Sequence, residues 1–399
     1  MAKPYFLIVA VTVVGLGLGL GAGFVFLPGM RRAPVTLPTF ASLASIPAGA
    51  CSPNLECTAP ALPPIQTSGS VPSDLLASAF ATKENWTVAP GTREILVPHH
   101  LVAARQMASL YAATPKPSIV YLVTPDHFSQ GKTAFTTTER SFATASSTVD
   151  GSADAVRTLL TAVPSLSLDD APFVKELGVY NELPFIAYQW PSVKVVPIIV
   201  RIDATQEERI SLAQALEARL QADPHALLVV TVDFSHYLPA EVADFHDVLA
   251  LDVVKSLSDL EADKVELDSP GALAVGLKVA RDMGLGDVTV QDHTNSLRLL
   301  NATVSQESTS HIFASFSPGP IQAEHVSTLL FTGDMMFDRE VATRSQKAGS
   351  LAYPFQNIQG QEDRFFKGQD LVVANLEGPV TAVRRPPVKS LDFAFSPLI

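Results

Sequence analysis

Three apolar segments of this sequence end in residues that can bind a metal ion or carry a proton. They are EILVPHHL, with His99 and His100, VYLVTPDHFSQG, with Asp126 and His127, and VVTVDFSHY, with Asp233, Ser235 and His236. Neutral imidazole is a good ligand for zinc, copper or iron, and a nearby carboxylate can bind the ion or orient a ligand histidine. The pattern therefore indicates a metal centre or an acid–base site.

The oxygen-bearing residues of these segments also have an ordinary structural interpretation. Asp233 or Ser235 could cap the helix predicted to follow them, because short polar side chains satisfy the free N–H groups of a helix start. For Asp126 and Ser235 we favour this structural role.

The histidines are harder to explain in that way. A lone histidine after a strand is usually a turn residue or a hydrogen-bonding group. His99, His127 and His236 together would require three such coincidences at strand ends, so we favour a shared site. The other histidines lack this context and are interpreted as ordinary: His225, His246, His293, His311 and His325.

The segments that must position these groups alternate between strand and helix patterns. Apolar, β-branched runs predict strands covered on both faces at 118–125, 193–201 and 226–234. Helical patterns follow in DGSADAVRTLLTAV, TQEERISLAQALEARLQ, PAEVADFHDVLALDVVKSL and SPGALAVGLKVARDMG, and SHIFASFS reads as a closing strand. This alternation predicts a layered α/β domain with a largely parallel sheet, whose ligands bind at the carboxyl ends of the strands.

The segments VPHHLVAA, VTPDHFSQG, NELPFIAYQWPSVKVVPIIV and VTVDFSHYLP resemble the Memo family, also called AmmeMemoRadiSam system protein B, over about residues 80–318. The resemblance implies the fold of the LigB-type extradiol dioxygenases and a metal held by two histidines and a cysteine. It makes His99 and His127 the histidine ligands. Asp233 and His236 would line the same pocket, Asp233 orienting a ligand or completing the metal shell and His236 acting as acid or base.

The sequence departs from the family pattern at two walls of this pocket. Pro270, preceded by Ser269, stands where a cysteine is usual. Leu177 and Tyr180 stand where a histidine and a glutamate are common. A third metal ligand would then have to come from Asp126, Asp233 or His236, and the ion could be iron, copper or zinc.

The N-terminal region predicts a membrane attachment. Tyr5 to Leu27 is uncharged and free of proline, and as a helix it would span about 34 Å against a hydrocarbon core of about 30 Å. This length favours an uncleaved anchor over a signal peptide, with the bulk of the protein outside the cytoplasm. The only two cysteines, Cys51 and Cys57, follow closely and fit a small disulfide in an oxidising compartment.

The C-terminal region carries a second resemblance. LLFTGDMMFDREV, YPFQNI and DLVVANLEGPVT are similar to the start of the CapA family of capsule or poly-γ-glutamate synthesis, which has a calcineurin-type metallophosphoesterase fold. The resemblance implies metal-site roles for Asp334, Asn375 and Glu377, and Arg339 matches a common basic position. The later asparagine and histidine motifs of that family do not occur before Ile399, so we expect only part of such a site.

Together these patterns predict a membrane anchor at 1–32, a Pro/Ala/Ser-rich linker at 33–74, a Memo-like domain at 75–318 and a partial CapA-like domain at 326–399. With a formal net charge of -12 and no basic stripe, the sequence argues against a nucleic-acid partner. The preferred function is a metal-dependent oxidoreductase linked to cell-envelope or capsule polymer synthesis. Two alternatives stay open: a non-catalytic binding module with an eroded metal site, and a metallophosphoesterase that uses the C-terminal region.

Overall fold

The computed structural model describes residues 62–69, 71–145, 147–302, 307–321, 327–356, 366–383, 385–386 and 392–398. The predicted anchor at 1–32, the cysteines Cys51 and Cys57 and most of the predicted linker lie outside these ranges. Within the described ranges, no helix is long and apolar enough to cross a membrane. Packing begins before residue 75, because Ile65 and Val71 are buried in the core.

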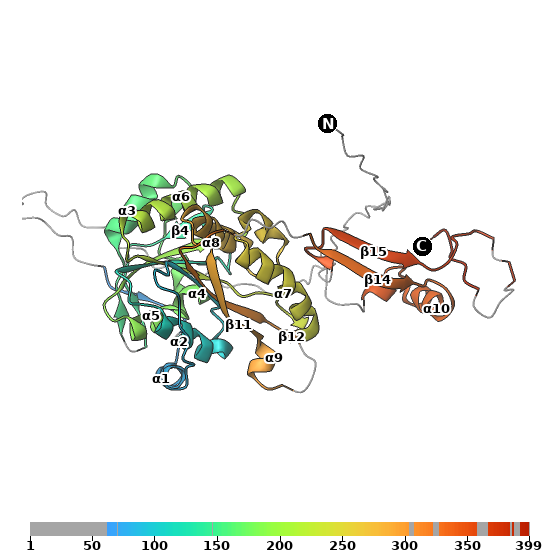
Figure 1. Cartoon of the computed structure of the whole chain (residues 1–399), viewed down its shortest axis with the longest axis horizontal. Coiled ribbons are helices and arrows are strands. Elements are labelled where there is room, and N and C mark those ends of the chain that lie inside the picture. Colours follow the sequence, from blue (N-terminus) through green and yellow to red (C-terminus); the bar gives the residue numbers. More distant parts are fainter. Residues whose placement is uncertain are drawn as a thin grey trace, which may run out of the picture. The chain divides into compact units, whose positions relative to one another are not determined.

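The domain is built on a mixed, largely parallel sheet of eight strands in the order β11-β13-β2-β9-β3-β8-β4-β7 (Figure 1). Its strands are β2 (Glu94–Val97), β3 (Ile119–Pro125), β4 (Phe135–Thr137), β7 (Leu166–Leu168), β8 (Lys194–Val200), β9 (Leu227–Thr231), β11 (Asp287–Asn295) and β13 (Ser310–Ser317). The four central strands β2, β9, β3 and β8 run parallel, whereas β13 pairs antiparallel with β2 at one side and β4 antiparallel with β8 at the other. The predicted α/β class with a largely parallel sheet is confirmed.

Helices cover both faces of this sheet, as Figure 1 shows. The helices are α1 (Ser73–Ala81), α2 (Ala104–Ala113), α3 (Ala153–Ala162), α4 (Leu177–Tyr180), α5 (Leu183–Gln189), α6 (Gln206–Ala222), α7 (Ala240–Lys255), α8 (Pro270–Asp282) and α9 (Ser296–Leu299). Residues of α3, α6, α7 and α8 enter one hydrophobic cluster, and residues of α1, α2 and α5 enter the other. Short strand pairs complete the domain: β1 (Ile65–Gln66), β5 (Phe142–Ala143), β6 (Thr148–Val149), β10 (Leu238–Pro239) and β12 (Glu307–Ser308).

The two hydrophobic clusters follow from the alternation of side chains along each strand. In β3, Tyr121 and Val123 point into the first cluster, whereas Val120 and Leu122 point into the second. Successive side chains of a strand face opposite sides of the sheet, so a strand covered on both faces must be apolar throughout. The continuous apolar runs recognised in the sequence are therefore the central strands of a three-layer domain.

Local signals set where the helices begin. α6 starts with a capping box. The Thr205 side chain accepts from the Glu208 N–H, and the Glu208 carboxylate accepts from the Thr205 N–H. α8 starts with Pro270 in its first turn, and Ser269 accepts a hydrogen bond from the Ala272 N–H. This cap matters for function, because the residue just before it, Asp268, enters the site described below.

The C-terminal part contains a separate two-stranded parallel sheet of β14 (Leu329–Met335) and β15 (Leu371–Leu376). Two helices accompany it, α10 (Arg339–Ala348) and α11 (Tyr353–Gln356). Asp338 caps α10 through the Arg339 N–H, and Gly349 ends the helix with a φ of 66°, a left-handed conformation that glycine adopts without strain. The predicted strand, turn and helix start at this position are therefore present.

Candidate metal centre

The adjacent parallel strands β2, β9 and β3 deliver the site. Because they run parallel, their carboxyl ends meet at one edge of the sheet. His99 follows β2, His127 follows β3, and Asp233 and His236 follow β9. The structure brings these strand ends together at Asp268. Possible ligand atoms of His99 and His127 form one group with Asp268, and those of Asp233 and His236 form a second group with the same residue.

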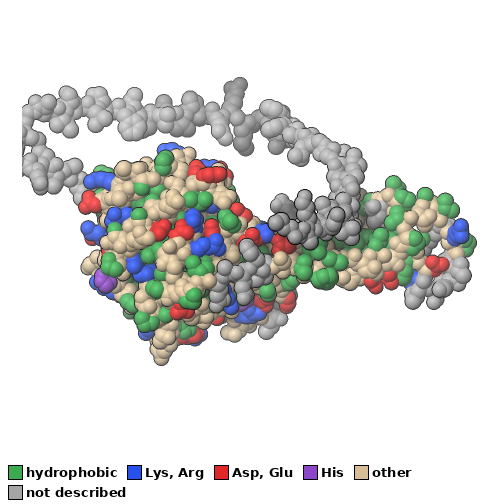
Figure 2. Space-filling model, turned by 45° about the horizontal axis from the view of Figure 1, so that its top comes forward, with side chains coloured by type: hydrophobic (Ala, Val, Ile, Leu, Met, Phe, Trp, Pro, Cys, Tyr) green, Lys and Arg blue, Asp and Glu red, His purple; other side chains and the backbone are tan. Residues whose placement is uncertain are grey.

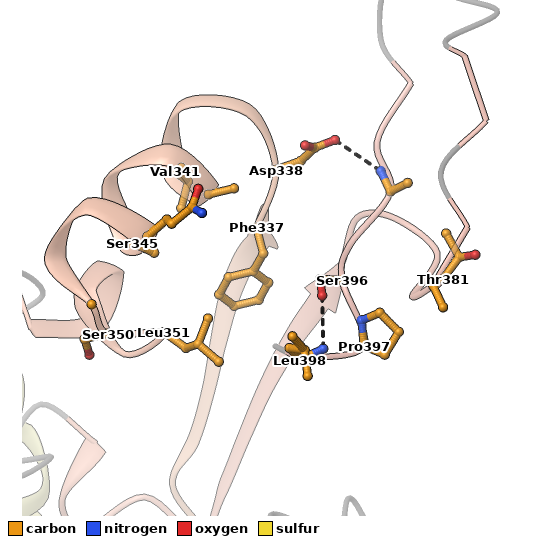
Figure 3. Close-up of a pocket in the computed structure, with 15 residues that line it drawn as sticks. Phe337, Asp338, Val341, Ser345, Ser350, Leu351, Thr381, Ser396, Pro397 and Leu398 are labelled. Carbon is orange, nitrogen blue, oxygen red and sulfur yellow. Dashed lines mark hydrogen bonds between the residues drawn. The ribbon is translucent and has the colours of Figure 1, made fainter.

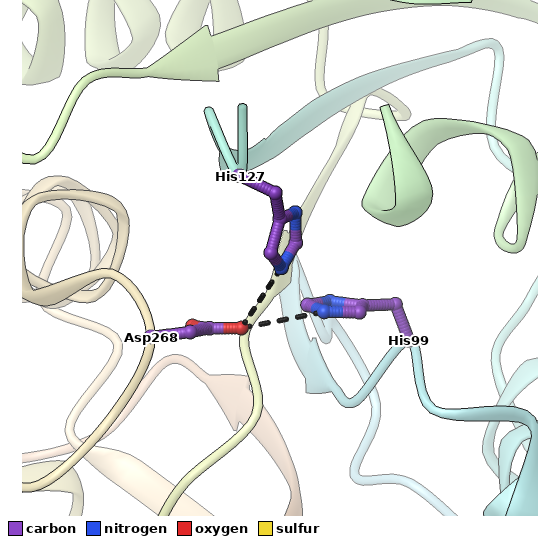
Figure 4. Close-up of side chains that lie close together, drawn as sticks. All are labelled: His99, His127 and Asp268. Carbon is purple, nitrogen blue, oxygen red and sulfur yellow. Dashed lines mark ion pairs between the residues drawn. The ribbon is translucent and has the colours of Figure 1, made fainter. Parts of the chain in front are cut away.

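The centre of the site is the carboxylate of Asp268, which His99 and His127 both face (Figure 4). The Nε2 atom of His99 lies 3.3 Å from Asp268 Oδ2, and Nε2 of His127 lies 3.5 Å from the same oxygen. The imidazole rings of His99 and His127 meet edge to face with centroids 4.8 Å apart. Two ring nitrogens and one carboxylate oxygen therefore converge from three separate segments of the chain.

Hydrogen bonds on the far side of His127 set its orientation. Its Nδ1 lies 2.5 Å from Oε1 of Glu176, and Oε2 of Glu176 accepts from the His127 backbone N–H at 3.1 Å. Glu176 is the N-cap of α4 and is 1% exposed. A proton on Nδ1 that is donated to a carboxylate leaves Nε2 to face the site, which is the arrangement of a metal-ligating histidine.

His99 is oriented by a buried chain of hydroxyl and carboxyl groups. Its Nδ1 lies 3.1 Å from Thr231 Oγ1, and that hydroxyl donates to Glu182 Oε1 at 3.2 Å. Because the Thr231 hydroxyl gives its proton to Glu182, it accepts from the His99 Nδ1–H. Tyr111 donates to the other oxygen of Glu182 at 2.5 Å. Burial raises the pKa of Glu182 to about 8, although Tyr111, His99 and Thr231 act against this rise.

The neighbouring carboxylates raise the pKa of both site histidines. Burial by itself lowers the pKa of His99, but Asp233 and Asp268 outweigh it and raise the pKa to about 9. Burial by itself also lowers the pKa of His127, but Asp268 and Glu176 outweigh it and raise that pKa to about 10. Conversely, burial raises the pKa of Asp268, yet the two histidines overcome it and hold that pKa below the usual value.

A second pair of residues, Asp233 and His236, stands beside this group. Oδ2 of Asp233 lies 3.3 Å from His99 Nε2, and ligand atoms of Asp233, His236 and Asp268 lie within 4.8 Å of one another. The backbones of Asp233 and Asp268 are tied together, since Asp268 N–H donates to Asp233 O and Asp233 N–H donates to Asp268 Oδ2. The predicted pocket residues of β9 therefore do lie at the site.

The donor set fits a metal ion. Oδ1 of Asp268 is buried and has no hydrogen-bond partner within the described part of the chain. An unpaired buried carboxylate oxygen is costly, and it is satisfied when a cation stands in front of it. Imidazole nitrogens and carboxylate oxygens whose ligand atoms lie within 4.8 Å of one another can hold such an ion.

Asp126 and Ser235, for which the sequence favoured a structural role, form hydrogen bonds outside the groups of possible ligands. Asp126 turns toward its own loop, where its carboxylate oxygens accept from the backbone N–H groups of Gln130 and Gly131 at 3.0 and 2.7 Å. The Ser235 hydroxyl donates to Oδ1 of Asp247 on α7 at 3.4 Å. Neither Asp233 nor Ser235 caps α7, whose N-cap residue is Pro239 without a side-chain hydrogen bond.

The sequence patterns missed the carboxylates that complete the pocket walls. Asp268 lies two residues before Pro270, where a cysteine was expected, and Glu176 lies one residue before Leu177, where a histidine was expected. A search for acidic residues within two positions of each substituted residue would have found both. The motifs lack the expected cysteine and histidine, and carboxylates one or two residues earlier in the sequence contact the site histidines.

His311 is another site residue that sequence reasoning classed as ordinary. It lies on β13, is fully buried, and its Nδ1 is 3.1 Å from Asp233 Oδ1. Its ring stacks on that of His100, with centroids 5.5 Å apart. Because the other oxygen of Asp233 faces His99, His311 fixes which way that carboxylate points.

This contact gives a prediction with a matched pair of variants. His311→Leu should weaken metal binding by about 10–100-fold, as expected when the partner of a metal-site group is lost. His311→Asn should retain most of the affinity, because its amide can donate to Asp233 from nearly the Nδ1 position. Competition with a chromophoric chelator would measure both, and equal losses in the two variants would contradict the orienting role.

A further group of possible ligands, Asp244, Asp247 and His293, has a structural explanation. His293 Nε2 bonds Asp247 at 2.7 Å, and Ser310 donates to the other oxygen of Asp247 at 2.8 Å. Arg298 pairs with Asp244. These bonds join α7 to β11 and β13 and leave the carboxylates already partnered.

In the C-terminal part, two of the three predicted CapA-type residues meet. Asn375 donates to Asp334 Oδ1 at 2.6 Å, and the two residues are paired in register across β14 and β15. Glu377 follows, with its N–H bonded to Met335 O at 3.3 Å. The metal-site roles of these residues remain predictions.

A pocket of about 620 Å³ lies next to this sheet (Figure 3). It is lined by α10 and the last described segment, and Asp338 accepts there from the Ala394 N–H at 3.2 Å. Asp334, Asn375 and Glu377 are not among its lining residues. The pocket and the predicted phosphoesterase-type residues are therefore separate features.

The fold and the site define a class of protein: an α/β domain with a buried histidine–aspartate cluster at the carboxyl edge of its parallel strands. The chain belongs to the Memo-like protein family, whose family model matches residues 74–312. Residues 328–397 match the model of the bacterial capsule synthesis protein PGA_cap. Both resemblances drawn from the sequence are thereby confirmed.

Similar proteins include MEMO1 family proteins and one solved structure. A MEMO1 family protein of Pyrobaculum arsenaticum is 25% identical over 213 residues, covering 50% of this chain and 75% of the relative. One from Aquifex aeolicus is 24% identical over 216 residues, covering 51% and 79%. The crystal structure of an uncharacterised Escherichia coli K12 protein is similar over 55% of this chain and 99% of its own, with 14% identity and a TM-score of 0.40.

Proposed function

We propose that the Memo-like domain binds one divalent metal ion through Nε2 of His99, Nε2 of His127 and the carboxylate of Asp268, and acts as a metal-dependent oxidoreductase. The observation that carries this proposal is the convergence of both Nε2 atoms on Asp268 Oδ2, at 3.3 and 3.5 Å. Each ring is also anchored through Nδ1, to Thr231 and Glu176. Because the histidine rings are already held in place, binding of the ion would cost little additional conformational entropy.

The side chains around the ion have distinct roles in this proposal. A bound ion would supply a Lewis-acidic or redox-active centre with open coordination positions. Burial lowers the pKa of His236, although Asp268 and Asp233 oppose this. His236 therefore stands at the site as a neutral imidazole that can accept a proton from a substrate group.

The alternative function, a non-catalytic binding module with an eroded site, rested on the substitutions at Leu177 and Pro270. Carboxylates stand beside both positions, since Glu176 bonds His127 and Asp268 faces both ligand histidines. A two-histidine remnant would bind a divalent ion weakly, whereas two imidazoles with a carboxylate form a recognised ligand set. These contacts favour the metal-dependent function.

Metal analysis of the purified protein tests the proposal. We expect about one iron, zinc or other divalent ion per chain, and His127→Ala should abolish it because two ligands hold such an ion poorly. His225→Ala is the matched control, since His225 is exposed and distant in the fold from the strand ends that form the site. Absence of stoichiometric metal after both aerobic and anaerobic preparation would contradict the proposal.

The cellular setting is also part of the proposal. The PGA_cap match at 328–397 supports a link to an envelope or capsule polymer, or to the machinery that makes it. The apolar segment Tyr5–Leu27 would anchor the protein, with its bulk outside the cytoplasm. Digestion of intact cells by added protease should then remove the Memo-like domain. A domain that stays fully protected from the protease would contradict this placement.

A further inference from the structure

The ligand set of the centre contains nitrogen and oxygen donors alone. The three groups that converge are the imidazoles of His99 and His127 and the carboxylate of Asp268, with the carboxylate of Asp233 next to them. The two cysteines of the chain, Cys51 and Cys57, lie in the N-terminal region, and none occurs in the part that the structure describes. Sulfur is the donor that soft ions such as copper(I) prefer, whereas imidazole and carboxylate suit harder divalent ions.

The negative charge of the site also favours a divalent or trivalent ion over a univalent one. Asp233 and Asp268 have side chains 2% and 9% exposed, and Oδ2 of each lies 3.3 Å from Nε2 of His99. When the histidines are neutral and bind the ion, the two carboxylates leave a charge of about −2 in a buried site. An uncompensated charge is costly there, so an ion of charge +2 or +3 is favoured over a univalent ion.

Resting on the proposed function, we infer that Asp268 makes this a hard-ligand centre that selects iron(II) and discriminates against copper(I). Two imidazoles and one carboxylate with open positions form the ligand set typical of non-haem iron(II). The unpartnered Oδ1 of Asp268 provides an oxygen that can turn toward the ion. The anionic surroundings also stabilise the ferric state, so that the site suits an ion that changes its charge.

The test compares metal selectivity in the full chain with Cys51→Ser and Cys57→Ser, so that these thiols cannot bind copper. Anaerobic titrations with iron(II), against a chromophoric chelator, and with copper(I), against bicinchoninate, give both affinities. We expect His127-dependent binding of one iron(II). Copper(I) should bind no more tightly than it does to the His127→Ala form of the same chain.

Substitutions at Asp268 make the test specific to that side chain. Asp268→Asn keeps the size and removes the charge, and should lower iron(II) affinity by at least about 100-fold, since losing even a partner of a ligand costs about 10–100-fold. Asp268→Cys should gain His127-dependent copper(I) binding. Loaded with cobalt(II), it should show a sulfur-to-cobalt charge-transfer band that the Asp268 form lacks.

The outcomes separate this inference from the proposed function. Tight copper(I) binding that depends on His127 in the Asp268 form would overturn the selectivity while leaving the metal site in place. An Asp268→Cys variant that binds cobalt(II) without the sulfur band would show that residue 268 does not contact the ion. Absence of any His127-dependent metal would instead overturn the proposed function itself.

Discussion

Metal binding should weaken by about 100-fold for each unit that the pH falls below 9, because the ion must displace about two protons. The pKa of His99 is raised to about 9 and that of His127 to about 10, so both imidazoles are protonated in the metal-free protein at neutral pH. The carboxylates that raise these pKa values are the groups that would bind or neutralise the ion. Protons and metal thus compete for one set of charges.

Calorimetry of zinc binding in buffers with different ionisation enthalpies would count the released protons. Glu176→Gln is the control, because removing that carboxylate should lower the pKa of His127 and move the count toward one. A metal affinity that is constant between pH 6 and pH 8 would contradict the protonated, metal-free site described here.

The same shifts set how the metal-free protein responds to pH. The two histidines have raised pKa values in the folded state, so the stability they add is fully present below their unfolded pKa of about 6.5. That contribution should disappear as the pH rises through 9 and 10. The metal-bound protein should lack this loss, since the ion then occupies the place of the protons.

Gly178→Ala should destabilise the protein by about 2–3 kcal/mol, the cost typical of overpacking a buried site. A Cβ atom at residue 178 would lie 1.8 Å from Oγ1 and 3.0 Å from Cβ of Thr124, which is fully buried. Turning the Thr124 side chain relieves only the first contact, so the backbone of α4 must move. Glu176 accepts from the Gly178 N–H at 3.1 Å, so this movement also disturbs the partner of His127.

Urea unfolding of the metal-free protein and chelator competition would measure the two effects of Gly178→Ala. Thr124 Oγ1 has no hydrogen-bond partner among the described residues, so adding Thr124→Ala should restore much of the lost stability. Gly333→Ala is the control, since nothing lies within 4 Å of its added Cβ. Unchanged unfolding and unchanged metal affinity in Gly178→Ala would refute the close approach at Thr124.

Much of the fold could be predicted because its signals are local. The apolar runs at 118–125, 193–201 and 226–234 correspond to β3, β8 and β9, and the cap at Thr205 begins α6 as its sequence indicates. Burial on both faces requires continuous apolar strands, so the composition of a run reveals its layer. The positions of His99 and His127 after their strands followed from the same reasoning.

The site carboxylates could not be predicted in this way, because their roles depend on contacts between distant segments. Glu176 lies 49 residues from His127, and Asp233 lies 78 residues from His311. No spacing rule connects such pairs.

The face of the molecule drawn in Figure 2 shows no gathering of histidines. On the face drawn in Figure 2, acidic and basic side chains are interspersed among apolar ones and hardly any histidine is visible. This agrees with the burial of His99 and His311, which are 4% and 0% exposed.

The sequence by itself determined the α/β class, the family and the strand ends at which chemistry could occur, because strand periodicity and short motifs are properties of contiguous residues. The tertiary structure alone decided which carboxylates serve the histidines. Asp268 and Glu176 take positions next to those where Pro270 and Leu177 had removed the expected side chains. Tertiary packing determines which side-chain atoms reach the site. A carboxylate one or two residues away in the sequence can therefore contact the histidines in place of the expected side chain.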